Sequence, residues 1–122
     1  MEPQCLITGT RAYGPVSKNS DLDVVIRSDH VQILGQFLLV NNIDIQEVNE
    51  HYASFYFTIP GLPKINIIVA ENQEVFDEWE YATEKMKKLR RPILDHEKRV
   101  ETFIRFRGQY RDQNCHEVDV FN

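Results

Sequence analysis

The chain has no apolar run that approaches the roughly 18 residues of a membrane-spanning helix. Its first residues, MEPQCLITG, lack the charged segment and long apolar stretch of a secretory signal. Cysteine is scarce, and Cys5 and Cys115 have neither zinc-site nor redox spacing. We therefore expect a cytoplasmic protein with free thiols and no membrane contact.

Several familiar functional patterns are also missing. The sequence contains no GxxxxGK[ST] loop, no internal repeat and no low-complexity linker. None of the four histidines, at positions 30, 51, 96 and 116, accompanies a serine or cysteine in a recognisable nucleophile motif. These absences exclude P-loop and repeat architectures and give no support to a histidine-dependent hydrolase.

What remains is sufficient for one compact unit. The chain has 122 residues, of which 42% are hydrophobic, and this length is common for a single domain, here residues 1–122. Hydrophobic periodicity predicts an α+β order of strands and helices. The predicted strands are residues 5–8, a strand that carries Asp21 and Asp23, and residues 43–48, 52–59 and 64–70; a helix covers 29–42 and a turn 60–63.

The run from Leu6 to Ile26 contains the chain's clearest chemistry. Asp21 and Asp23 are two residues apart on a predicted strand, so their side chains share one face while alternate apolar residues point into a core. Paired carboxylates suit Mg²⁺, which prefers oxygen ligands and usually keeps positions for water and substrate phosphate. The pair therefore predicts a magnesium site that works with a nucleotide.

A glycine turn precedes this strand. Gly9 and Thr10 follow an apolar strand and open a helical turn that ends near Gly14, where backbone N–H groups and a hydroxyl suit a phosphate. Arg11 adds a permanent cation with a planar donor fork. Each pattern alone also fits an ordinary turn or helix cap, and the order of both patterns favours a binding site.

Together these residues resemble the polymerase-β-like nucleotidyltransferase superfamily, and its minimal members most closely. The match consists of Gly9-Thr10, a spacer, and Ser20-Asp21-Leu22-Asp23, with Thr10 in place of the usual serine. The resemblance implies an α+β nucleotidyltransferase fold, in which helices pack on a mixed β-sheet and two helices follow at the C-terminus. It further implies Mg²⁺-dependent transfer of a nucleoside monophosphate from a nucleoside triphosphate, with ATP as the first candidate, to a hydroxyl acceptor. It also implies that Asp21 and Asp23 hold the metal and that Gly9, Thr10, Arg11 and Ser20 contact the nucleotide.

The superfamily takes a third catalytic carboxylate from a strand that corresponds to residues 64–70, where this chain has Asn66. An amide has no useful basicity, so Asn66 can orient a group in the catalytic site but cannot accept its proton. Glu71, Asp44 or Glu47 could supply the missing acid instead. The alternative function is a catalytically weakened nucleotide-binding or regulatory module, because minimal family members often work beside a helical partner subunit.

The C-terminal third is predicted to be helical and basic. An apolar stripe runs from Val75 to Leu89, and a second helix is expected after Pro92, through Phe103 to about Tyr110. Residues 85–111 hold ten basic and three acidic side chains. This stretch could hold a triphosphate or an RNA acceptor, or only complement the helix dipoles. The last residues are expected to form a polar tail or a short added strand.

Overall fold

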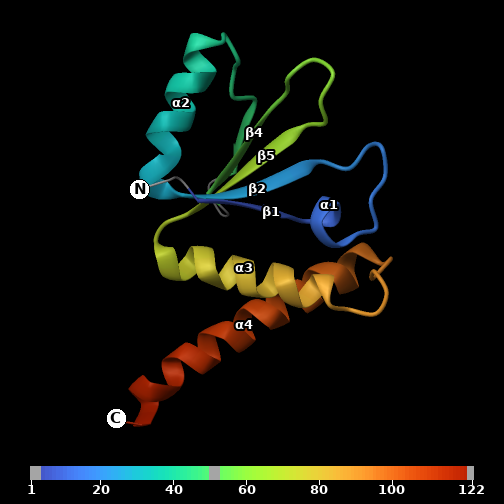
Figure 1. Ribbon diagram of the computed structural model, residues 1–122, viewed down its shortest axis with the longest axis vertical. Coiled ribbons are helices and arrows are strands. Elements are labelled where there is room, and N and C mark those ends of the chain that lie inside the picture. Colours follow the sequence, from blue (N-terminus) through green and yellow to red (C-terminus); the bar gives the residue numbers. More distant parts are fainter. Residues whose placement is uncertain (1–3, 50–52, 121–122) are drawn as a thin grey trace.

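The computed structural model describes residues 4–49 and 53–120, with side chains except those of 47–49 and 114–120. The chain has an α+β fold with a mixed sheet, as the sequence predicts (Figure 1). Its strands are β1 (Cys5–Thr8), β2 (Leu22–Arg27), β3 (Glu47–Asn49), β4 (Ser54–Phe57) and β5 (Ile65–Ala70). Its helices are α1 (Thr10–Tyr13), α2 (Val31–Val40), α3 (Gln73–Lys87) and α4 (His96–Val120), and a 3₁₀ turn, η1 (Ser28–His30), precedes α2.

The strand order in the sheet is β1-β2-β5-β4-β3. β2 and β5 pair in parallel and every other neighbouring pair is antiparallel. The register places Thr8, Asp23, Asn66 and Tyr56 side by side across four strands. Directly paired residues point to the same face, so this row brings residues from distant parts of the chain together on one face of the sheet.

Helices cover both faces of the sheet, with α2 on one side and α3 on the other (Figure 1). Ile26 and Ile67 pack with Leu38 of α2 in one buried cluster. Val25 packs with Phe76 of α3 in another. Because β2 and β5 are central and covered twice, they need apolar residues on both faces, which explains their nearly continuous hydrophobic sequences.

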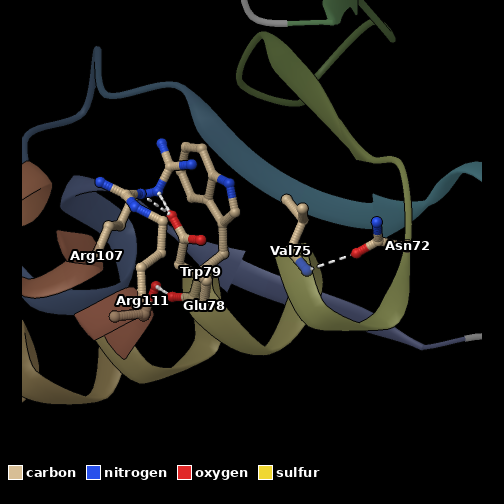
Figure 2. Close-up of polar contacts among 7 residues, drawn as sticks. Asn72, Val75, Glu78, Trp79, Arg107 and Arg111 are labelled. Carbon is tan, nitrogen blue, oxygen red and sulfur yellow. Dashed lines mark hydrogen bonds and ion pairs between the residues drawn. The ribbon is translucent and has the colours of Figure 1, made fainter. Parts of the chain in front are cut away.

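Helix α3 is capped at its N-terminus and joined to α4 through a residue in its first half. At its start, the Asn72 side chain accepts a hydrogen bond of 2.9 Å from the Val75 amide, which caps the helix (Figure 2). Further along, Arg107 and Arg111 of α4 both donate to the buried Glu78 carboxylate, at 2.7 and 2.5 Å. The Arg107 guanidinium also lies 4.7 Å from the Trp79 ring. These contacts join α4 to α3.

The predicted strand over residues 43–48 is largely wrong. The Ile43 amide donates to the Leu38 carbonyl and the Asn42 amide to the Leu39 carbonyl, while Asn42 has a φ of 56°. This is a Schellman ending of α2, in which Ile43 packs back on Leu38. The apolar Ile43 therefore belongs to the helix cap, and β3 starts only at Glu47. Likewise β4 is shorter than the predicted 52–59, and Tyr52 lies outside the described residues.

The last helix also differs from its prediction at both ends. It starts at His96, where Asp95 accepts a hydrogen bond from the Lys98 amide, so an aspartate rather than Pro92 begins it. It then continues to Val120, and the expected tail or strand is helical instead. None of the described helices is both long and apolar enough to cross a membrane.

Candidate functional site

Asp23 lies near the start of β2, on the face covered by α3. Its neighbours in register are Thr8 on one side and Asn66 on the other. The Asn66 amide nitrogen donates to Asp23 Oδ1 at 3.3 Å. Strand β5 thus pairs with β2, and Asn66 occupies the position next to Asp23.

Gly9 directly follows β1 and packs against the Asp23 carboxylate. A Cβ built on Gly9 would lie 2.1 Å from Asp23 Oδ2, and the φ of Gly9 is +71°. Only glycine tolerates both the close approach and this backbone conformation. The turn after it forms as predicted: α1 spans Thr10–Tyr13 with Gly14 as its C-cap, and no side chain caps its N-terminus.

Asp21 precedes β2 and lies close enough to affect Asp23 electrostatically. Burial raises the pKa of the Asp23 carboxyl, and the hydrogen bond from Asn66 opposes that increase. The negative charge of Asp21 raises the pKa of Asp23 further, whereas the positive charge of Lys64 lowers it. Lys64 Nζ lies 3.6 Å from Asp21 Oδ2. The structure thus gathers two carboxylates, one amide and one ammonium at the same end of the sheet.

Arg11 and Ser20 connect α1 to the loop before β2. Arg11 Nε donates to the Ser20 carbonyl at 2.9 Å, and Ser20 Oγ accepts from the Ser17 amide at 2.9 Å. Ser20 therefore has a local structural role in its loop. The contact orients the Arg11 guanidinium, and contacts from either residue to a nucleotide stay a prediction.

A cleft of about 570 Å³ opens over this group of residues. Thr10, Asp23 and Asn66 line one side, and α3 and α4 line the other. Its apolar part includes Trp79 and Phe103, whose ring centroids are 5.0 Å apart. Val100 and Ile104 of α4 are exposed and line this cleft.

Two cationic side chains of α4 enter the cleft wall. Arg99 donates to the carbonyls of Ile93 and Leu94, which fixes its guanidinium at the start of α4. Arg107 lines the same wall while it pairs with Glu78. The sequence shows that this stretch is basic, but it does not show that Arg99 and Arg107 face the cleft. Which side chains of α4 face the cleft depends on how α4 crosses α3.

Tyr13, the last residue of α1, also lines the cleft. Its ring stacks on Phe103, with centroids 6.1 Å apart. Burial raises the pKa of Tyr13 to about 12; the charge of Asp23 adds to this increase and the charge of Arg99 reduces it. The phenol therefore stays protonated at neutral pH and can donate a hydrogen bond into the cleft.

The three proposed substitutes for a third acid do not reach the site. Glu71 follows the opposite end of β5 from Asn66, beyond Ala70, which pairs with Arg27. Glu47 is on β3, three strands from β2, or about 14 Å by ordinary strand spacing. Asp44 is an exposed residue before β3. Among the described residues, no group of three or more acidic, histidine or cysteine side chains could hold a metal.

The remaining donors fit a metal with few protein ligands. Asp21 and Asp23 offer hard carboxylate oxygens, and the Asn66 side chain, which directs its amide nitrogen at Asp23, is the next residue across the sheet. Mg²⁺ commonly binds through one or two carboxylates and takes its other ligands from water and phosphate. Burial raises the pKa of the Asp23 carboxyl, and the neighbouring Asp21 charge raises it further, so a cation bound between them would stabilise the ionised form.

Comparison of the chain with models of protein families, with curated proteins and with solved structures finds no match in any of the three.

Proposed function

We propose that the protein binds Mg²⁺ with a nucleoside triphosphate and transfers the nucleoside monophosphate to a hydroxyl acceptor, on a nucleotidyltransferase fold. The observation that supports this best is the packing of Gly9 against the half-buried Asp23 carboxylate, beside Asn66, in the lining of a cleft of about 570 Å³. This arrangement lets a polypeptide backbone and a metal-binding carboxylate approach the same phosphate group.

Each residue has a distinct task in this proposal. Asp21 and Asp23 would hold the metal. The bound metal ion would act as a Lewis acid on the α-phosphate. Gly9, Thr10, Arg11 and Ser20 position the triphosphate. The acceptor oxygen bonds to the α-phosphorus while the bond to the β-phosphate oxygen breaks and pyrophosphate leaves. Asn66 orients the reacting groups, and the acceptor proton passes to water because an amide cannot accept it.

The chemistry of the cleft suggests the chemical class of the nucleotide, the acceptor and the partner. The cleft joins an apolar, aromatic part to a cationic wall that includes Arg99. Such a surface suits a nucleotide base together with phosphate charge. ATP is the first nucleotide to test, RNA or a protein hydroxyl is the acceptor, and a helical partner subunit is a candidate source of that hydroxyl.

Calorimetry with ATP, with and without Mg²⁺, tests the binding. Asp21→Asn and Asp23→Asn should each weaken Mg²⁺-dependent ATP binding by more than about tenfold, since even changes around metal ligands cost this much. Asp44→Asn removes an equal charge from an exposed position away from β2 and is the matched control. Unchanged affinity in both site variants would exclude the site.

A second candidate function is a nucleotide-binding module with little or no transfer. The observation that favours it is Asn66 beside Asp23, without a third carboxylate nearby among the described residues. Such a module would bind Mg²⁺ and ATP and pass the bound state to a partner. Incubation with α-labelled ATP and a cell extract separates the two functions, because only the transferase attaches label covalently.

Asn66→Asp supplies the missing carboxylate and sharpens this test. It should tighten Mg²⁺ binding, and a transferase should then gain turnover, because general-base assistance is commonly worth about 10²–10⁴-fold. Asn66→Leu, which removes the polar group, is the opposite control. A gain in metal affinity without any labelled product would favour the binding module.

A further inference from the structure

Lys64 is a cation held next to the aspartate pair. It directly precedes β5, and its Nζ lies 3.6 Å from Asp21 Oδ2 and 4.2 Å from the centre of the Tyr56 ring. The side chains of Lys64 and Asp21 are both 41% exposed. The ammonium thus lies between a carboxylate and an aromatic face, where both neighbours attract it.

The sheet fixes this position. The Leu22 amide donates to the Lys64 carbonyl at 2.8 Å, which ties the start of β5 to the start of β2. Lys64 and Asn66 are two residues apart, so they point to one face. Tyr56 is the direct partner of Asn66 on β4. Lys64 therefore has three neighbours on this face of the sheet. Asp21 comes from just before β2, Tyr56 from β4, and Asn66 from β5 itself.

The charge of Lys64 partly balances the site. Lys64 forms an ion pair with Asp21, and among the described residues no other basic side chain pairs with Asp21 or Asp23. Its charge also acts on Asp23, whose pKa it lowers. The group of Asp21, Asp23, Asn66 and Lys64 carries one formal negative charge instead of the two it would have without the ammonium.

Resting on the proposed function, we propose that Lys64 is a resident cation that occupies Asp21 when no metal is bound and moves to the triphosphate when the metal binds. The exchange is inexpensive because partly exposed ion pairs contribute little and the lysine stem is flexible. Repulsion from the metal releases the ammonium from Asp21, and the phosphates that arrive with the metal give it a new partner.

This exchange predicts effects of opposite sign on two ligands. Without the ammonium, the metal alone meets no competitor at Asp21, so Lys64→Met should bind Mn²⁺ about two- to fivefold more tightly. The same variant loses a charged phosphate contact, so it should bind the Mg²⁺–ATP complex about tenfold more weakly. A lysine with only a structural role would change both affinities in the same direction or neither.

The experiment measures Mn²⁺ binding by electron paramagnetic resonance and Mg²⁺–ATP binding by calorimetry. Lys64→Arg keeps the charge and should stay close to the wild type. Lys85→Met is the matched control, because Lys85 also lies over a tyrosine ring, 5.4 Å from the centre of Tyr81, but on α3. It should leave both affinities unchanged. Parallel shifts in Lys64→Met, or no shift, would overturn the proposal.

Amine labelling of the wild type gives a second, independent measurement. Acetic anhydride should modify Lys64 faster when Mn²⁺ is present and more slowly again when Mn²⁺ and ATP are both present, with Lys85 constant. Constant labelling of Lys64 would refute the exchange while leaving metal and nucleotide binding intact. A wild type that binds neither Mn²⁺ nor Mg²⁺–ATP would instead overturn the proposed function, and the role of Lys64 with it.

Discussion

Asp23 illustrates, at the scale of a single residue, how a group in the candidate site opposes the stability of the fold. Burial raises its pKa, so folding favours the protonated carboxyl. This stabilisation is complete below the unfolded pKa, about 3.9, and is lost as the pH rises through the higher folded value. At neutral pH the ionised carboxylate therefore destabilises the metal-free protein.

Asp23→Asn should consequently raise the melting temperature at pH 7, because the neutral amide keeps an oxygen to accept from Asn66 and avoids burial of a charge. The gain over the wild type should shrink as the pH falls towards 4, where Asp23 becomes protonated. Thermal unfolding across this pH range measures it, with Asp44→Asn as an exposed control. A variant that melts below the wild type at pH 7 would contradict the argument.

Gly9 makes a second prediction at this scale. Gly9→Ala should destabilise the protein by about 1–3 kcal/mol, because a side chain there strains the backbone and meets the Asp23 carboxylate. Displacement of Asp23 should also weaken Mg²⁺-dependent ATP binding. Urea unfolding and calorimetry measure the two effects.

Gly35 offers the matched control for that change. It lies within α2, and a Cβ on it would meet nothing within 4 Å. Gly35→Ala should stabilise the protein by about 0.5–1 kcal/mol, since alanine is the better helix residue. Equal effects of the two substitutions would show that Gly9 has no special constraint.

Helix α3 is joined to the sheet by a buried pair of hydroxyls. Thr83 donates to the Trp79 carbonyl at 2.8 Å, so the Thr8 hydroxyl donates the 2.7 Å bond to Thr83. Both residues are almost fully buried. Because Thr8 pairs with Asp23 in register, this bond positions the end of β1 where the site begins.

A double-mutant cycle isolates this bond. Thr83→Val should cost about 1–3 kcal/mol, because it leaves the Thr8 hydroxyl buried without an acceptor. Thr8→Val with Thr83→Val removes both polar groups and should recover part of the loss. Urea unfolding of the wild type, both single variants and the double variant gives the coupling. Strict additivity would indicate that the hydroxyls do not depend on each other.

The elements that could be predicted are those with local signals. β1, α1 and β5 follow from alternation and glycine, and the pairing of Asp23 with Asn66 follows once β5 lies beside β2. Ile43 could not be placed, because its apolar side chain serves a helix cap as readily as a strand. Leu38 and Leu39 are adjacent apolar residues of α2, and the pattern does not show that Leu38 is buried whereas Leu39 is 78% exposed.

The parts of the site that sequence analysis missed depend on tertiary packing. Lys64 has no motif of its own, and its role appears only when β2 places Asp21 beside it. Arg99 faces the cleft because α4 crosses α3, where Glu78 holds Arg107 and Arg111. Periodicity identifies a basic helix but not which of its cations face a site.

At the scale of the whole molecule, positive charge is concentrated in residues 85–111, part of which lines the cleft. Residues 85–111 hold ten basic and three acidic side chains in a chain whose net charge is −5. α4 presents part of this charge, including Arg99, to the side of the cleft opposite Asp23. The molecule therefore combines overall acidity with a local attraction for anions.

The affinity for Mg²⁺–ATP should therefore fall several-fold when the salt concentration rises from about 50 mM to about 200 mM, because salt screens exposed charges. Arg99→Ala should reduce both the affinity and its salt dependence. Arg105→Ala removes an exposed charge of α4 that does not line the cleft, and it should change them little. Calorimetry at two salt concentrations measures this, and equal effects of the two variants would show that the attraction is general.

The position of Asn66 beside Asp23 also has an evolutionary consequence. Asparagine and aspartate codons differ only in their first base, so one nucleotide transition would introduce a carboxylate at this point of the sheet. The two side chains have nearly the same shape, and β5 would keep its register with β2. The exchange would replace a hydrogen bond to Asp23 with repulsion between like charges. Under the proposed function, stability of the metal-free protein would favour asparagine at this position, whereas proton acceptance during transfer would favour aspartate.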